Sequence, residues 1–157
     1  MHRKNKNKIP SLCAVDFFCS GGGMTSGFRK AGINEVGGID IDVDCKETYV
    51  TNNPTSKFIH ADIKELSFTT LKNELGLKIK DDNMIFIGCS PCQYWSKIHT
   101  DKTKAKETMN LLRDFQRFVH HFKPGFVVIE NVPGILNKFQ ESPLKEFLNF
   151  LDKEKYS

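Results

Sequence analysis

The segment Leu12-Cys13-Ala14-Val15-Asp16-Phe17-Phe18 is an apolar run, and Cys19-Ser20-Gly21-Gly22-Gly23 follows it directly. β-Branched and aromatic residues favour strands, and glycines let the backbone turn tightly and approach a ligand without a Cβ clash. The pattern therefore predicts a buried strand, a tight turn and then a helix. The dinucleotide-binding fingerprint G-x-G-x-x-G is not met, because Ser26 occupies its last position, and this disfavours a dehydrogenase.

The rest of the chain repeats this alternation of strand and helix. Strands are expected at residues 12–18, 36–40, 57–60, 84–88 and 126–130. Helices are expected at residues 24–31, 43–51, 69–75, 108–122 and 143–155, the last with Ser142 as its N-cap and Pro143 in its first turn. The alternation predicts an α/β fold with a doubly wound, mostly parallel sheet. Ligands bind such sheets beyond the carboxyl ends of the strands, where the motifs below are found.

The bulk composition is that of one ordinary globular domain. The 157 residues carry a formal net charge of +4, with 39% hydrophobic and 27% charged residues. No apolar run approaches the ~20 residues that cross a bilayer, and no signal-peptide pattern opens the chain. The five cysteines are an odd number without framework spacing, so we expect a reducing cytoplasmic setting. Residues 1–10 are expected to form a basic, disordered tail.

Two strand-end motifs together suggest a reaction. Ser90-Pro91-Cys92-Gln93 follows the apolar residues 84–87, and Glu130-Asn131 closes the apolar residues 126–129. Cytosine C5 is a poor nucleophile until something adds at C6. A thiolate can add there, and a carboxylic acid near N3 can make C6 more electrophilic. The pairing of a thiol with a carboxylate therefore indicates attack on a pyrimidine ring.

Taken with Asp16 to Phe28, these motifs resemble those of the DNA (cytosine-5)-methyltransferases, over about residues 12–157. The resemblance implies a Rossmann-like methyltransferase fold, double-stranded DNA as partner, a flipped-out target base and a role in restriction-modification. It also implies that Cys92 is the nucleophile, that Glu130 meets cytosine N3 and that Asn131 orders the backbone at the strand end.

The cofactor implied by the resemblance is S-adenosyl-L-methionine. Asp40 ends an expected strand, where a carboxylate can accept hydrogen bonds from both hydroxyls of a ribose. By resemblance, Phe18 and Ile41 flank the adenine and Asp62 accepts from its amino group. The remaining cofactor contacts implied in this way are Gly21, Gly23, Ile63, Pro91 and Leu111. Ser20 departs from the glycine that is usual at its place in the family's loop.

The spacing of Cys89 and Cys92 leaves two other interpretations open. A thioredoxin-like redox pair is expected at the first strand–helix junction of its fold, whereas this pair follows the fourth strand. A zinc site needs a second pair of ligands, and Cys13, Cys19 and Cys45 lack the spacing of a zinc ribbon. We expect no metal.

The resemblance stops at residue 157, before the family's later motif, its target-recognition domain and its C-terminal helix. We therefore expect residues 11–157 to be a partial catalytic domain: a fragment, a truncated gene product or one subunit of a split enzyme. In the last case a second polypeptide carries the missing motifs. An RNA-directed relative with the same chemistry and a non-catalytic S-adenosylmethionine-binding module are the alternative functions. Lys97, Lys102, Lys104 and Lys106 are candidates for contacts with DNA phosphates.

Overall fold

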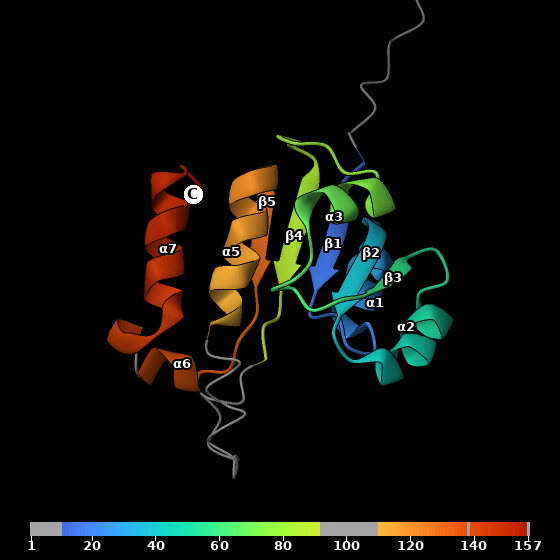
Figure 1. The fold of residues 1–157 in the computed structure, drawn as a ribbon, viewed down its shortest axis with the longest axis horizontal. Coiled ribbons are helices and arrows are strands. Elements are labelled where there is room, and N and C mark those ends of the chain that lie inside the picture. Colours follow the sequence, from blue (N-terminus) through green and yellow to red (C-terminus); the bar gives the residue numbers. More distant parts are fainter. Residues whose placement is uncertain (1–10, 92–109, 138, 157) are drawn as a thin grey trace, which may run out of the picture.

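The structure, a computed structural model, describes residues 11–91, 110–137 and 139–156. Its centre is a five-stranded sheet in the order β3-β2-β1-β4-β5, in which all neighbouring strands run parallel (Figure 1). The strands are β1 (Cys13–Phe17), β2 (Asn34–Asp40), β3 (Lys57–His60), β4 (Met84–Gly88) and β5 (Phe126–Ile129). The predicted α/β fold with a doubly wound sheet is confirmed, and the predicted strand ends differ from these by at most two residues.

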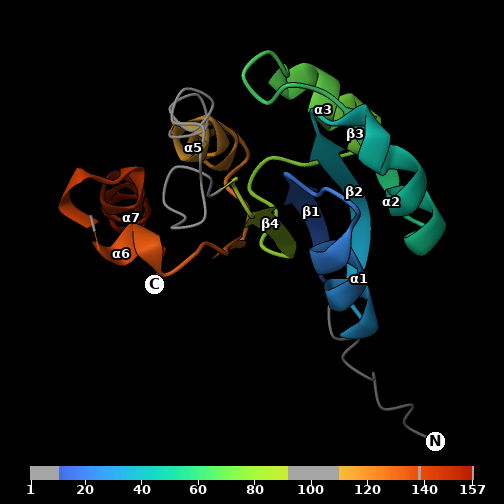
Figure 2. The same ribbon diagram turned by 90° about the horizontal axis from the view of Figure 1, so that it is seen from below.

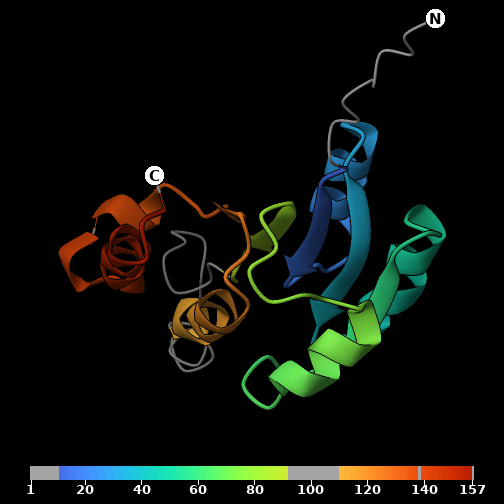
Figure 3. The ribbon, with the colours of Figure 1, turned by 90° about the horizontal axis from the view of Figure 1, so that it is seen from above.

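Helices cover both faces of the sheet. Helix α1 (Gly23–Lys30) lies on one face, with α2 (Lys46–Asn52) beside it, and α3 (Phe68–Leu75) and α5 (Leu111–Phe122) lie on the other (Figure 2). Helix α7 (Pro143–Lys153) packs against α5 on the side away from β1 and β2 (Figure 3). None of the helices in the described part of the chain is long and apolar enough to cross a membrane.

The alternation of side chains along β1 divides the core into two layers. Val15 and Phe17 face α3 and α5, where the Phe17 ring lies 5.1 Å from the rings of both Phe86 and Phe115. Ala14 faces the other way, into a smaller apolar cluster beneath α1. A fully buried phenylalanine stabilises the fold by about 1.5–3 kcal/mol relative to an exposed one. The larger layer, on the α5 face, therefore holds β1 and β4 in place.

One local prediction was wrong. The helix predicted over residues 43–51 is divided into a short 3₁₀ turn (Val43–Cys45) and α2. The cause is Asp42, whose side chain accepts from the amide of Asp44 at 3.0 Å and caps the tighter turn. The predicted start of α7 is confirmed, with Ser142 at the N-cap position and Pro143 in the first turn. The Ser142 hydroxyl donates to the carbonyl of Phe139 at 2.9 Å and makes no capping hydrogen bond to the helix.

The segment between β5 and α7 also differs from the prediction. The sequence predicts no helix there, yet the segment contains a short helix, α6 (Gly134–Asn137), and a 3₁₀ turn (Phe139–Glu141). The predicted start of α5 at residue 108 lies outside the described residues, and the described helix begins at Leu111. β5 is an edge strand that exposes an apolar side chain, since Phe126 is 50% exposed.

Candidate cofactor and catalytic site

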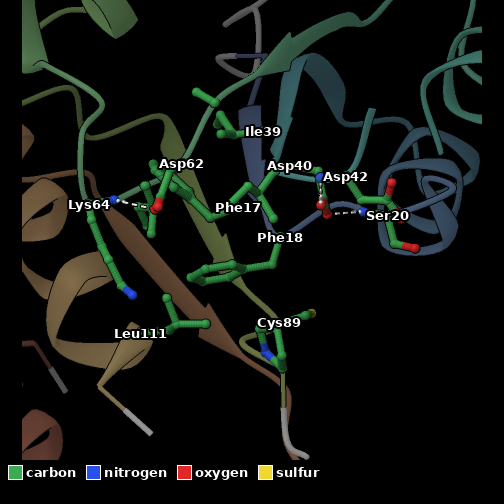
Figure 4. Close-up of a pocket in the computed structure, with 14 residues that line it drawn as sticks. Phe17, Phe18, Ser20, Ile39, Asp40, Asp42, Asp62, Lys64, Cys89 and Leu111 are labelled. Carbon is green, nitrogen blue, oxygen red and sulfur yellow. Dashed lines mark hydrogen bonds between the residues drawn. The ribbon is translucent and has the colours of Figure 1, made fainter. Parts of the chain in front are cut away.

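A cavity of about 570 Å³ lies beyond the carboxyl ends of β1, β2, β3 and β4 (Figure 4). Seven of the predicted site residues line it: Phe18, Asp40, Ile41, Asp62, Ile63, Pro91 and Leu111. The other lining residues are Phe17, Ser20, Ile39, Asp42, Ala61, Lys64 and Cys89. Sequence reasoning assigned none of these seven to the cofactor, although each lies next to a residue that it did assign or at most three residues away.

Asp40 is held in a fixed orientation at the cavity wall. One carboxylate oxygen accepts from the amide of Ser20 at 2.8 Å, and the other accepts from the amide of Asp42 at 2.9 Å. Each carboxylate oxygen has two acceptor positions, so both can still accept a second donor. The arrangement suits a ligand that presents two neighbouring hydroxyls.

The turn after β1 adopts a backbone conformation that residues other than glycine rarely adopt. Phe18 has φ +64° and Ser20 has φ +45°, both in the left-handed region. Gly22 has φ +83°, and a Cβ added there would lie 2.2 Å from the amide nitrogen of Asn53. Strained residues of this kind cluster at functional sites when the surrounding structure holds them. The strain places the Phe18 ring in the cavity.

Gly21 and Gly23 do not line the cavity. Gly23 is the first residue of α1, and Gly21 approaches Thr48 on the α2 side of the loop, where an added Cβ would lie 3.2 Å from a methyl carbon. Their predicted contact with the cofactor therefore remains a prediction, and what the structure assigns to them is the shape of the turn.

Asp16, on β1, stabilises the helix that follows this turn, and the sequence did not single it out as a site residue. One of its oxygens accepts from both the hydroxyl and the amide of Thr25, at 2.8 and 3.2 Å, and so caps α1. Burial raises the pKa of Asp16 to about 6, against the lowering effect of the Thr25 hydrogen bonds. Its position shortly before the glycines was the one feature of the sequence that could have pointed to it. That an aspartate in a strand caps a helix nine residues later cannot be inferred from sequence alone.

Asp62 begins the turn after β3. Its side chain accepts from the amide of Lys64 at 2.9 Å, and its carbonyl accepts from the amides of Glu65 and Leu66. The side chain therefore orders its own turn while lining the cavity (Figure 4). Ile63 is 5% exposed and packs in the core, whereas Ile41 is 63% exposed and offers apolar surface to a ligand.

Cys89 lines the cavity but has a weakly acidic thiol. Burial, and then the negative charges of Asp16 and Glu130, raise the pKa of Cys89 to about 12. A redox-active pair needs a cysteine with a lowered pKa, so this environment speaks against the redox interpretation. Across the described ranges, which leave out Cys92, no cluster of three metal-ligating side chains is present.

On the catalytic side, the structure describes the acid and the start of the cysteine loop. Glu130 is exposed directly after β5. Asn131 accepts from the amide of Val132 at 2.9 Å and donates to the hydroxyl of Ser90 at 3.4 Å, which joins the end of β5 to the loop after β4. Cys92, together with Lys97, Lys102, Lys104 and Lys106, lies outside the described residues.

A sheet of this topology, with its cavity at the carboxyl ends of the strands, is that of the Rossmann-like S-adenosylmethionine-dependent methyltransferases. A DNA modification methyltransferase of an E. coli prophage, known from a crystal structure, superposes with a TM-score of 0.74 at 26% sequence identity. The alignment covers 91% of this chain and 38% of that one.

The sequence profile of the family described as C-5 cytosine-specific DNA methylase matches residues 12–157. The chain therefore belongs to this family. It is 32% identical over 142 residues to the type II methylase M.HgiDII of Herpetosiphon aurantiacus, an alignment that covers 90% of this chain and 39% of the relative. It is 34% identical over 143 residues to the type II methyltransferase M.DdeI of Desulfomicrobium norvegicum. That alignment covers 91% of this chain and 32% of the relative. The chain thus spans between about a third and two fifths of these relatives.

Proposed function

We propose that this chain forms the N-terminal part of the catalytic domain of an enzyme that transfers a methyl group from S-adenosylmethionine to C5 of cytosine in double-stranded DNA. The observation that carries the proposal is the single cavity that gathers Phe18, Asp40, Asp62 and Leu111 beside the loop leading to Cys92. Membership of the family supports the same reaction. The reaction also needs the later motifs of the family, and the setting is the cytoplasm.

The cavity fits the nucleoside part of the proposed cofactor. The fixed carboxylate of Asp40 suits two ribose hydroxyls, and apolar surface from Phe18, Ile41 and Leu111 suits the faces of a purine. Asp62 accepts from the exocyclic amino group. When bound, S-adenosylmethionine supplies an electrophilic methyl group, and the chain's own residues orient it.

The remaining residues act on the base. The Cys92 thiolate adds to C6, and the electrons of the C5–C6 double bond move to C5. C5 then takes the methyl group as the bond from that group to the sulfonium sulfur breaks and S-adenosylhomocysteine leaves. Loss of the C5 proton and expulsion of the thiolate restore the aromatic ring. Glu130 places a proton at N3 and offsets the negative charge that builds on the ring as the thiolate adds. The target base reaches these groups by flipping out of the duplex, at a cost of a few kcal/mol.

Asn131 keeps the two catalytic segments together. Its hydrogen bonds to Val132 and Ser90 join the strand end that bears Glu130 to the loop that bears Cys92. A change in either segment is therefore transmitted to the other, which suits a reaction that needs the acid and the thiol on one ring.

The test is transfer of tritium from labelled S-adenosylmethionine to duplex DNA, with and without a second polypeptide that carries the later motifs. We expect no transfer by the chain alone, and transfer when the partner is added. Weak, salt-sensitive DNA binding by the chain alone is consistent with this result. Robust transfer by the isolated chain would contradict the role given to the later motifs. Transfer to tRNA and not to duplex DNA would replace the proposed substrate with RNA.

A further inference from the structure

Arg117 joins two walls of the proposed cofactor site. It lies on α5, and its guanidinium Nη2 donates to the carbonyl of Ile63 at 2.9 Å and to the carbonyl of Lys64 at 3.2 Å. These residues belong to the turn after β3 and are more than fifty positions away in the chain. Ile63 and Lys64 line the cavity on one side, and Leu111, the first residue of α5, lines it on another.

The guanidinium is held from several directions. It lies over the rings of Phe68 and Phe118, with its central carbon 5.9 and 5.6 Å from the two centroids. Its Nε is 3.9 Å from a carboxylate oxygen of Asp114, one turn earlier on the same helix. Contacts with two rings and a carboxylate limit the rotamers of a long side chain, so less freedom is lost when it binds the carbonyls.

The turn that Arg117 binds is the one that orients Asp62. The carbonyl of Asp62 accepts from the amides of Glu65 and Leu66, at 3.0 and 2.9 Å, and its side chain accepts from the amide of Lys64. These bonds use the amides of the turn. Arg117 supplies the donors for the outward-facing carbonyls of Ile63 and Lys64.

We propose that Arg117 is a positioning residue for the adenine end of the site. Arg117 and Leu111 stand on one rigid helix, separated by about 9 Å at the usual rise per residue. By binding the turn from that helix, Arg117 sets the distance between Asp62 and Leu111, and thereby the width of the slot for the base. The proposal rests on the proposed function, because it takes the ligand to be S-adenosylmethionine.

The chain offers a matched control in Arg113, one turn earlier on α5. Its guanidinium binds both carboxylate oxygens of Glu146 on α7, at 2.8 and 2.9 Å, and does not line the cavity. Arg117→Met and Arg113→Met therefore each remove one tie between α5 and a neighbour. Only the first removes a tie to the turn, and Arg117→Lys keeps the charge but lacks the planar fork.

Two measurements on this chain test the proposal. The first is hydrogen exchange at the amides of Glu65 and Leu66, which we expect to speed up in Arg117→Met and to stay unchanged in Arg113→Met. The second is binding of S-adenosylmethionine, and separately of adenosine, by ligand-observed NMR. We expect both affinities to fall by the same factor, about fivefold to tenfold, in Arg117→Met, as for loss of a charge-assisted bond at a partly exposed site. Arg117→Lys should recover part of this loss.

Three outcomes would count against these ideas in different ways. Wild-type affinity in a folded Arg117→Met variant would overturn the positioning role. Equal losses of affinity in Arg113→Met and Arg117→Met would also overturn it, because they would show that Arg117 acts only by stabilising α5. Failure of the unmodified chain to bind S-adenosylmethionine would contradict the proposed function, while the exchange data would still report whether Arg117 holds the turn.

Discussion

The two sides of the sheet's carboxyl edge are built differently. At the ends of β1, β2 and β3, side chains that line the cavity are fixed by backbone amides: Asp40 by Ser20 and Asp42, and Asp62 by Lys64. At the ends of β4 and β5, Glu130 is exposed, and a 3.4 Å hydrogen bond from Asn131 to Ser90 joins the segments that follow the two strands. The first side is organised before any ligand arrives, whereas the second has room to rearrange around a base.

This difference suggests that cofactor binding and methyl transfer are separable. Changes on the preorganised side should act on affinity, and changes on the other side should act on turnover.

The largest effect is expected on the catalytic side. In a complete enzyme, Cys92→Ala should abolish methyl transfer and leave S-adenosylmethionine binding largely intact, because the thiol forms the bond to C6. Tritium transfer and calorimetry measure the two quantities. Cys13→Ala is the control, since Cys13 lies at the opposite end of β1. A tenfold loss of turnover corresponds to an increase of about 1.4 kcal/mol in the activation barrier. A variant that keeps a tenth of the wild-type turnover or more would rule out Cys92 as the nucleophile.

On the cofactor side, Asp40→Ala should weaken S-adenosylmethionine binding by roughly 1–3 kcal/mol, the scale for loss of a charged hydrogen-bonding partner. Calorimetry on a complete enzyme measures the change. Asp44→Ala is the matched control, because Asp44 is an exposed carboxylate close in sequence that does not line the cavity. Unchanged affinity in Asp40→Ala would move the ribose contact to another residue.

Glu35, a buried residue near the start of β2, should make the free energy of unfolding depend on pH. It is 1% exposed, neither carboxylate oxygen has a hydrogen-bond partner within the described residues, and burial followed by the charge of Asp16 raises its pKa to about 8. Between its ordinary pKa of 4.5 and about 8, the folded state keeps a proton that the unfolded state has lost. Stability therefore falls as pH rises through this range and levels off above it.

Glu35→Gln should remove this dependence and stabilise the protein at alkaline pH by about 1–3 kcal/mol or more, because an amide stays neutral where the buried carboxyl loses its proton. Urea unfolding at about pH 5, pH 7 and pH 9 measures it. Asp16, whose pKa is raised from 3.8 to about 6, contributes with the same sign at lower pH. Because Asp16 is present in both proteins, the difference between them should grow from about pH 4.5 to about pH 8 and then level off. A difference that stays constant over this range would contradict the assignment to Glu35.

The smallest effect concerns Ser20. Its φ of +45° is costly for a residue with a side chain, by about 1–2 kcal/mol, and glycine's extra freedom in the unfolded chain takes back roughly 0.5–1 kcal/mol. Ser20→Gly should therefore stabilise the protein slightly, by up to about 1 kcal/mol in urea unfolding. Ser26→Gly, inside α1, should have the opposite sign, at about 0.5 kcal/mol. If both substitutions change the free energy of unfolding in the same direction, relief of backbone strain at Ser20 does not explain the effect.

The two sides of the edge were also not equally open to prediction from sequence. The strands could be placed because their apolar runs are bounded by turn residues, and β3 (Lys57–His60) and β4 (Met84–Gly88) agree with the expected ranges. Asp40 and Asp62 could be singled out because each follows an expected strand, and both line the cavity. Parallel topology brings such positions together whatever the details of packing.

The supporting contacts could not be predicted, for a physical reason. Asp16 and Glu35 are 1% exposed, and Arg117 reaches across from α5 to the turn after β3. Sequence periodicity assigns polar side chains to the surface, and nothing in it reports a contact that only tertiary packing creates. The broken helix over residues 43–51 has the same origin, since capping by Asp42 outweighs helix propensity.

The most direct test of the central claim is a crystal structure of this chain with S-adenosylhomocysteine, the demethylated product of the proposed cofactor. We expect the ribose hydroxyls on the carboxylate of Asp40 and the adenine between Phe18 and Leu111, with Asp62 at its amino group. A ligand bound elsewhere on the molecule, or bound in the cavity with its ribose away from Asp40, would contradict it.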